Sequence, residues 1–232
     1  MKKHKVFIAC DTSNLRLVKK IINQTKKIKE LNLIPKFGLQ FFYSKNGRNF
    51  LEKFKGEFFL DIKAADISTT AESAIDSIKD LKGCRYITIH AHGGLEMMKA
   101  VKKKAREINK KIKILGITVL TSLDNKALKE IGHMRSVKQL VLRQASLIKK
   151  SGIDGCVLSG QEAKIVKKKY KNLFVVTPGI RLPGDKKDDQ SRVVTPRDAF
   201  VKFKADAIVM GRSLTKNNIK KNIQKLIDHL NQ

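Results

Sequence analysis

Asp61 and Lys63 are the residues of this chain whose types and spacing most directly suggest chemistry. They follow Phe58, Phe59 and Leu60, an apolar run that predicts a strand, and side chains alternate along a strand. The carboxylate and the ammonium are therefore expected on one face at the end of a buried strand. Such a pair could form catalytic machinery, although in a lysine-rich chain a solvated surface pair has the same appearance.

Gly211, Arg212 and Ser213 form a second candidate group, after the last apolar run. A glycine lets backbone N–H groups approach an anion, and a helix N-terminus favours negative charge. Arg212 can add two N–H donors to a phosphate. We expect a phosphate site here; a helix cap beside a surface arginine is the alternative.

A long polar loop runs from Thr177 to Arg192, with Gly and Pro at its start and charges through its middle. Long loops in compact domains are usually functional or disordered. Its position beside the expected phosphate site predicts that the loop is a closing lid, in which Arg181 and Gln190 reach the ligand. A loop without function is the alternative.

Eight short apolar runs would position these groups, because they alternate with longer amphipathic segments. The expected strands cover residues 6–10, 34–39, 57–62, 86–90, 112–119, 155–158, 173–176 and 207–210. The expected helices cover residues 15–31, 70–81, 94–108, 137–151, 161–170 and 215–230. This alternation predicts an α/β fold, a (β/α)8 TIM barrel formed by one catalytic domain over residues 1–232. An open, doubly wound sheet is the alternative.

The barrel prediction places the polar residues at the strand ends in a candidate active site. Active sites of such barrels lie at the carboxyl ends of the strands and in the loops that follow. Nearly every expected strand here ends in a group capable of chemistry, which a random scatter of surface charge would not produce. These residues are Asp11, Lys36, Asp61, Lys63, His90, Thr121, Ser122, Ser159 and Thr177.

The formal net charge of +29 raises nucleic-acid binding as a hypothesis. However, the lysines are spread along helix faces, aromatic residues make up 6% of the chain, and there is no Trp. A base-stacking surface would need interleaved aromatic residues, so we expect no nucleic-acid partner and ascribe the charge to a solvated surface that attracts anionic substrates.

The cysteines and the N-terminus indicate the compartment. Cys10, Cys84 and Cys156 form no Cys-x-x-Cys motif, which favours buried free thiols in a reducing cytoplasm. The basic N-terminus leads into an apolar run too short for a signal peptide, and no segment is long enough to span a membrane. We expect a cytoplasmic protein without a membrane partner.

Nearly the whole chain resembles the orotidine 5′-monophosphate decarboxylase family. The matching pieces occur in the family's order and at fitting spacing. They are Lys36-Phe37-Gly38, Asp61-Ile62-Lys63-Ala64-Ala65-Asp66-Ile67, His90-Ala91-His92-Gly93-Gly94, Thr118-Val119-Leu120-Thr121-Ser122, Ser159-Gly160-Gln161-Glu162-Ala163, Thr177-Pro178-Gly179-Ile180-Arg181, Asp189-Gln190-Ser191-Arg192 and Gly211-Arg212.

The resemblance implies a homodimeric barrel that converts orotidine 5′-monophosphate to UMP without a metal or an organic cofactor. It also implies a role for each matching residue. Lys63 would protonate C6 of the pyrimidine within an alternating charge network with Lys36, Asp61 and Asp66, and Asp11 would bind the ribose. Asp66, Ile67 and Thr70 would reach the partner subunit's site, Thr121 and Ser122 would lie at the pyrimidine end with Pro178 in the wall, and Arg181, Gln190, Gly211 and Arg212 would hold the phosphate.

Three positions depart from the family pattern, which usually has a bulky residue and His where Ala64 and Ala65 stand, and Pro where Ser68 stands. The Lys-Ala-Ala-Asp version also resembles 3-keto-L-gulonate 6-phosphate decarboxylase, a related barrel that uses a metal. The Thr-Pro-Gly-Ile-Arg segment and the Gln190 loop fit the pyrimidine enzyme better. A basic nucleic-acid-binding protein is the alternative outside enzymes, and it leaves the ordered strand ends unexplained.

Overall fold

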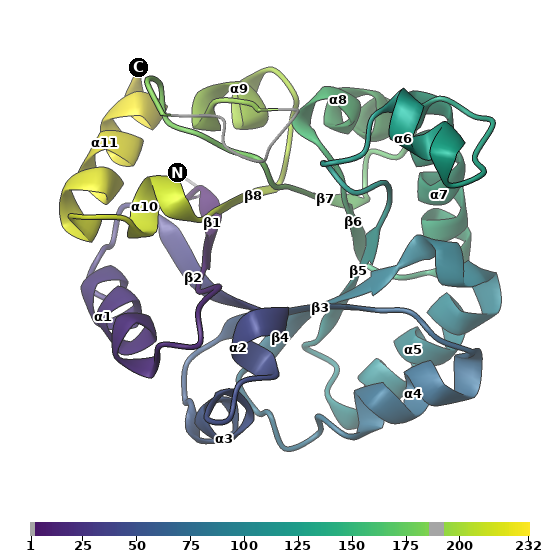
Figure 1. Ribbon diagram of the computed structural model, residues 1–232, viewed down its shortest axis with the longest axis horizontal. Coiled ribbons are helices and arrows are strands. Elements are labelled where there is room, and N and C mark those ends of the chain that lie inside the picture. Colours follow the sequence, from purple (N-terminus) through teal and green to yellow (C-terminus); the bar gives the residue numbers. More distant parts are fainter. Residues whose placement is uncertain (1–2, 186–192) are drawn as a thin grey trace.

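In the computed structural model, which describes residues 3–185 and 193–232, eight parallel strands close into a barrel (Figure 1). Each strand pairs with the next, and β8 returns to pair with β1, Val6 facing Ile208. This closure confirms the predicted barrel; the open sheet is wrong. The strands are β1 (Lys5–Ala9), β2 (Asn32–Gly38), β3 (Phe58–Ala64), β4 (Cys84–His90), β5 (Lys113–Ile117), β6 (Gly155–Val157), β7 (Phe174–Thr177) and β8 (Ala207–Met210).

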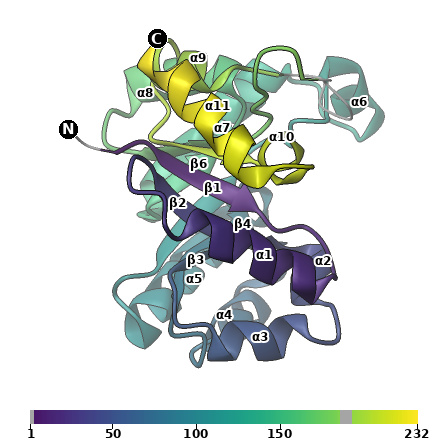
Figure 2. The same cartoon turned by 90° about the vertical axis from the view of Figure 1, so that its left-hand side faces the viewer.

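Helices surround the strands, as Figures 1 and 2 show. Those in the described part of the chain are α1 (Leu15–Thr25), α2 (Leu39–Phe42), α3 (Gly47–Lys53), α4 (Ser68–Asp76), α5 (Gly94–Ile108), α6 (Asn125–Glu130), α7 (Val137–Ser151), α8 (Gly160–Lys169), α9 (Pro196–Val201), α10 (Arg212–Thr215) and α11 (Ile219–Asn231). A short 3₁₀ turn, η1 (Ala91–Gly93), follows β4. Within the described part of the chain, none of the helices is long and apolar enough to cross a bilayer.

Several helices differ from the sequence prediction; the helix predicted over residues 70–81, for example, is α4 and ends at Asp76. The helix predicted over residues 15–31 ends at Thr25, whose hydroxyl donates to the carbonyls of Ile21 and Ile22. The helix predicted over residues 215–230 is preceded by a separate turn, α10, because Asn217 adopts a left-handed φ of 57°. Asn218 then starts α11, its side chain accepting the N–H of Lys221. Asparagine tolerates both roles well.

The barrel interior is filled with aromatic side chains below its open end. The ring of Phe7 packs edge-on against Phe59 and Tyr86, with centroids 4.7 and 4.9 Å apart. Tyr86 also accepts a hydrogen bond of 2.6 Å from the Lys5 ammonium at the start of β1. Interlocked rings leave little space inside the barrel, and the barrel's own cavity lies beyond them, at the carboxyl ends of the strands.

At the opposite end, one arrangement occurs twice. Asp154, just before β6, accepts the backbone N–H of Ile114 in β5 at 2.8 Å and the Lys102 ammonium of α5 at 2.5 Å. Asp206, just before β8, accepts the N–H of Val175 in β7 at 2.8 Å and the Lys167 ammonium of α8 at 2.9 Å. Each carboxylate thus fastens a helix and two strands at the amino ends of the barrel strands.

The three cysteines are buried free thiols, as the sequence predicts. Burial raises the pKa of Cys10 and of Cys84 to about 12, and it raises that of Cys156 as well. A thiol that stays protonated is a poor nucleophile, so these cysteines belong to the packing.

Candidate functional site

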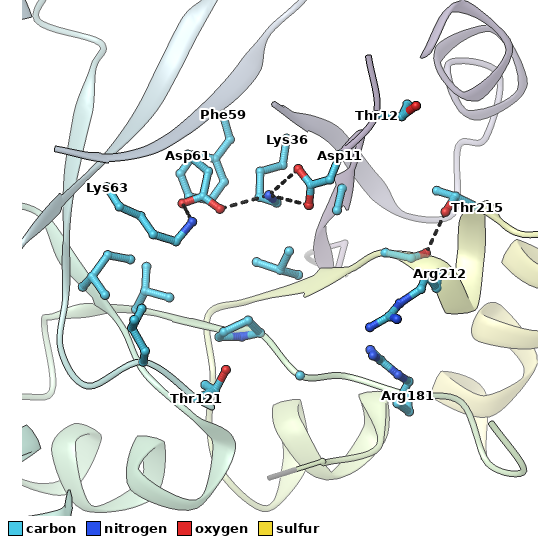
Figure 3. A pocket seen from close by; sticks show the side chains of 18 of the residues that line it. Asp11, Thr12, Lys36, Phe59, Asp61, Lys63, Thr121, Arg181, Arg212 and Thr215 are labelled. Atoms are coloured by element: carbon cyan, nitrogen blue, oxygen red, sulfur yellow. Dashed lines mark hydrogen bonds and ion pairs between the residues drawn. The ribbon is translucent and has the colours of Figure 1, made fainter. Parts of the chain in front are cut away.

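A cavity of about 550 Å³ opens at the carboxyl ends of the barrel strands. Figure 3 shows its side chains, which come from segments far apart in the sequence. The cavity brings together nine residues predicted as site residues. They are Asp11, Lys36, Asp61, Lys63, Thr121, Pro178, Arg181, Gly211 and Arg212.

Four charged groups form a chain of alternating sign along one wall (Figure 3). The Lys36 ammonium lies 3.1 Å from Asp11 Oδ1 and 2.9 Å from Asp61 Oδ2. The other oxygen of Asp61 lies 3.0 Å from the Lys63 ammonium. Lys36 and Asp61 are buried, whereas Lys63 is partly exposed toward the cavity. The chain therefore ends in an ammonium that a ligand can contact.

Mutual attraction keeps the buried members of this chain ionised. Burial opposes the charge on Asp61, but Lys36 and Lys63 outweigh it and lower the pKa of the carboxyl to about 2. Burial likewise opposes the charge on Lys36, and the Asp61 and Asp11 carboxylates outweigh it and raise the pKa of its ammonium. Buried charges persist when each has a close partner of opposite sign. The wall thus carries fixed charges at neutral pH.

The backbone of β3 is irregular where it carries these groups. The register of β3 with β4 shifts between Leu60 and Ala64, and Lys63 has a left-handed φ of 49°. Left-handed lysine is uncommon and costs about 1–2 kcal/mol. The sequence prediction placed Asp61 and Lys63 together by regular alternation; the structure brings them together through a bulge. The predicted contact is present, but its predicted cause was wrong.

The other end of the cavity carries two arginines. Figure 3 shows the guanidinium groups of Arg181 and Arg212 directed toward one another, on the side of the cavity opposite Asp61 and Lys63. Arg212 follows β8, and Arg181 follows β7 in a segment held by two hydrogen bonds: the Arg181 N–H donates to the Val194 carbonyl, and the Val194 N–H donates to the Gly179 carbonyl. Gly211 opens α10, which has only four residues, so the long helix dipole expected there is absent. Two planar donor groups remain suited to a phosphate.

Several predicted site residues lie elsewhere. Asp66, Ile67 and Thr70 are exposed and do not line the cavity of their own subunit, and Ile67 is 70% exposed. Asp66 accepts only the Ile67 N–H, at 2.7 Å, among the hydrogen bonds of the described residues. Ser122 is exposed beside the cavity. Gln190 and the rest of residues 186–192 of the predicted lid lie outside the described residues.

The sequence analysis assigned no role to three residues that lie around the charged chain. Thr88 contacts both Asp61 and the backbone of Lys63. Gly38 leaves room for Asp11, because a Cβ there would lie 2.4 Å from Asp11 Oδ1. His90 was noted only as a polar strand end. A polar Thr88 inside the apolar run of β4 was the available signal, whereas Gly38 was marked only as part of the matching piece Lys36-Phe37-Gly38.

His90 ends β4 and stacks on His92, with ring centroids 4.5 Å apart. Burial, then the neighbouring His92 and Lys63, lower the pKa of the His90 imidazole to about 4. Its ring is therefore neutral at physiological pH. No group of three or more His, Cys, Asp or Glu side chains within residues 3–185 and 193–232 is arranged to hold a metal ion.

Comparisons with known proteins agree on one family. A family model described as "Orotidine 5'-phosphate decarboxylase / HUMPS family" matches residues 4–225. The orotidine 5′-phosphate decarboxylase of Erythrobacter litoralis is 38% identical over 213 residues, covering 91% of this chain and 92% of that protein. The enzyme of the same name from Coxiella burnetii is 40% identical over 181 residues, 75% of this chain and 76% of that protein.

The solved structures extend the similarity to three dimensions. The crystal structure of orotidine 5′-phosphate decarboxylase from Lactobacillus acidophilus has a TM-score of 0.83 and 28% identity, covering 99% of this chain and all of that one. An uncharacterized conserved protein from Geobacillus kaustophilus has a TM-score of 0.79 and 26% identity, over 97% of this chain and 99% of that one.

Proposed function

The chain belongs to the orotidine 5′-phosphate decarboxylase / HUMPS family, and on that premise we propose that it decarboxylates orotidine 5′-monophosphate to UMP. The reaction is the last step of de novo synthesis of pyrimidine nucleotides, and the protein acts as a carboxy-lyase. The observation that carries the proposal is the chain Asp11–Lys36–Asp61–Lys63, which ends in an ammonium inside a cavity whose far end holds two arginines.

Lys63 is the proposed proton donor. The bond between C6 and the carboxylate breaks, CO₂ leaves, and the electron pair stays on C6, where the pyrimidine ring delocalises it poorly. The Lys63 ammonium stabilises this charge and transfers its proton to C6, and it then regains a proton from solvent. Asp61, 3.0 Å away, favours the charged form of the ammonium.

Asp61 has a second proposed role toward the substrate carboxylate. The residue is ionised and buried, so a carboxylate bound beside it is repelled and the reactant is disfavoured relative to the transition state. Lys36 holds Asp61 in place from the other side and fixes Asp11, the proposed ribose ligand. Charges fixed before the substrate arrives cost no reorganisation during the reaction.

The phosphate is proposed to bind between Arg181 and Arg212, with Gly211 and Gln190 as further ligands. Thr121 and Ser122 serve the pyrimidine end, and Pro178 forms part of the wall. Binding a phosphate remote from the bond that breaks can orient the ring toward Lys63. The opposed guanidinium groups at one end of the cavity support this orientation of the substrate.

The decisive experiment follows the absorbance of orotidine 5′-monophosphate after purified protein is added in the presence of EDTA. With no cofactor added, loss of the substrate band with formation of UMP in EDTA supports a decarboxylase that needs neither a metal nor an added organic cofactor. An EDTA-sensitive reaction on a sugar-acid phosphate would instead identify the metal-dependent relative, the phosphosugar decarboxylase. The carboxylates of Asp11 and Asp61 already contact ammonium groups, which favours the metal-free reaction.

A homodimer is also proposed, in which Asp66, Ile67 and Thr70 complete the partner's site. The exposure of all three supports this assignment, since an apolar Ile67 that is 70% exposed is suited to a contact with a second copy. The three free thiols support a cytoplasmic location.

Mixing two inactive variants tests the shared site. Lys63→Ala and Asp66→Ala should each be inactive alone. After the subunits exchange, a mixed dimer has one site with both residues intact, so random reassortment should restore about a quarter of wild-type activity. No recovery after proven exchange would place Asp66 and Lys63 in the same subunit's site or remove Asp66 from catalysis.

A further inference from the structure

Thr88 lies fully buried in β4, opposite the irregular part of β3. Leu60 pairs with Ile87 and Ala64 pairs with Ile89, so Thr88 alone faces residues 61–63 of β3. In a regular ladder each residue of β3 would pair with one residue of β4. The extra residues must bulge, and this single side chain faces the bulge that carries Asp61 and Lys63.

The hydroxyl of Thr88 joins the two residues through hydrogen bonds whose directions are fixed. The backbone N–H of Lys63 lies 3.0 Å from Thr88 Oγ1, and this group can only donate. Asp61 Oδ1 lies 2.9 Å from the same Oγ1 and, being ionised, can only accept. The one hydroxyl proton must therefore point to Asp61, and the orientation of the hydroxyl is determined.

The same oxygen of Asp61 also receives the Lys63 ammonium at 3.0 Å. Lys63 thus contacts Asp61 twice, through its side chain directly and through its backbone by way of Thr88. Its backbone is left-handed, with a φ of 49°, and its side chain is directed toward that carboxylate (Figure 3). Without an acceptor for the Lys63 N–H at this point, a partly buried donor would lose its partner, and the strained conformation of Lys63 would lose a hydrogen bond that supports it.

We propose that Thr88 is a positioning residue for the decarboxylation. Its hydroxyl holds the β3 bulge so that the side chains of Lys63 and Asp61 are correctly placed at the reacting carbon. The proposal rests on the proposed function in so far as Lys63 is the proton donor. It predicts that the rate of the chemical step depends on this hydroxyl. Phosphate binding, by residues that follow β7 and β8, should not depend on it.

Thr88→Val tests this, because it keeps the branched shape and removes only the hydroxyl. We expect kcat to fall about 10–100-fold, as for the loss of a hydrogen bond to a charged group, with UMP affinity changed less than about threefold. Thr88→Ser keeps the hydroxyl and should recover most of kcat. Thr118→Val is the matched control, since it removes another buried hydroxyl, which donates to the carbonyl of Val157 at 3.1 Å.

A spectroscopic readout separates positioning from a general loss of packing. In Thr88→Val the Lys63 amide resonance should shift, and the pKa of the Asp61 carboxyl, followed by ¹³C NMR, should rise because its charged form loses a donor. Thr118→Val should move neither signal. If Thr88→Val does not fold, Thr88→Cys, with a weaker donor of similar size, takes its place.

Near-normal kcat in the folded Thr88 variant, equal losses in both valine variants, or no recovery with serine would overturn the proposal. If the wild-type protein does not act on orotidine 5′-monophosphate, the proposed function fails. The role of Thr88 is then decided by the NMR signals alone, and unmoved Lys63 and Asp61 resonances would reject it.

Discussion

Lys63 combines a reactive position with an unfavourable backbone. Its left-handed conformation is maintained by the hydrogen bond to Thr88, and its ammonium is held 3.0 Å from Asp61. Strained residues persist where their surroundings determine them completely, and they are frequent at active sites. The residue-scale predictions therefore concern side chains that hold or use this arrangement.

Lys63→Ala should abolish turnover, because no other ammonium of residues 3–185 and 193–232 lies at the cavity end of the charged chain to protonate C6. Among described residues, Lys36 is the remaining ammonium of that chain, and it is buried between Asp11 and Asp61. The fold and much of the UMP affinity should remain. Steady-state kinetics, circular dichroism and calorimetric titration with UMP measure these quantities, and near-normal turnover would remove Lys63 from its role.

Arg212→Ala should weaken ligands that carry a phosphate far more than nucleosides without one. A bidentate, charge-assisted contact contributes about 1.5–3 kcal/mol, which corresponds to about 10–100-fold in affinity. Titrations with UMP and with uridine measure the difference. Equal weakening of both ligands would argue against a phosphate contact.

Gly38→Ala should impair nucleotide binding indirectly, by displacing the side chain of Asp11. The added Cβ would lie 2.4 Å from Asp11 Oδ1 and 3.4 Å from the Lys36 ammonium, so Asp11 must move away from Lys36. We expect KM for the nucleotide to rise about tenfold, as for one lost hydrogen bond to a charged group.

A double-mutant cycle shows whether the effect passes through Asp11. In an Asp11→Ala background Gly38→Ala should cost little, because the clash is gone. Additive losses would mean that Gly38 acts on something other than Asp11.

At the scale of elements, β3 shows where reading the sequence succeeds and where it stops. The apolar run predicted a buried strand, and the strand exists as Phe58–Ala64. The bulge at its end depends on pairing with β4, a contact between residues about 25 positions apart in the chain. Periodicity within one segment carries no information on such pairing, so neither the left-handed Lys63 nor the role of Thr88 could be predicted.

The same limit applies to the short helices. α5 and α7 were predicted with their observed bounds because fifteen residues display an amphipathic period. α2 and α10 have four residues each, too few for a period to appear, and they were missed. The charged groups of the cavity were found from sequence because polar residues interrupt the strand ends, and the barrel brings those ends together.

Asp154→Asn should lower stability without lowering kcat. The amide can still accept the Ile114 N–H, but the buried Lys102 ammonium loses its partner, at a cost of about 1–3 kcal/mol. The catalytic cavity lies at the carboxyl ends of the strands, far from Asp154, so a loss of stability here should leave kcat unchanged. Urea unfolding and kcat measure both.

Asp206→Asn provides the comparison at the other copy of this arrangement. Its pair with Lys167 is more exposed, 34% and 18% against 25% and 9% for Asp154 and Lys102, so its loss should be smaller. A larger effect at Asp206, or a fall in kcat with either variant, would contradict this account of the amino ends of the strands.

For the whole molecule, His90 links stability to pH. Burial, His92 and Lys63 lower its folded-state pKa to about 4, whereas an unfolded histidine titrates near about 6.5. Between these values the unfolded chain binds more protons than the native one, so the free energy of unfolding should rise with pH across this window. The contribution of His90 to the free energy of unfolding is complete above this pH window and is lost as the pH falls through it.

Denaturant unfolding at a series of pH values measures this slope. His90→Gln should flatten it between about pH 4 and about 6.5. His133→Gln, at an exposed position, is the control and should leave the slope as in the wild type. An unchanged slope in His90→Gln would mean that another group dominates acid destabilisation.

The pairing of β8 with β1 also has a consequence for synthesis on the ribosome. Until residues 207–210 emerge, β1 and β7 both present unpaired backbone edges, and the aromatic interior stands open on that side. Exposed strand edges are templates for association with other chains. Chains truncated before Ala207 should therefore aggregate, and chaperones should bind nascent chains up to that point and release them soon after the last strand appears.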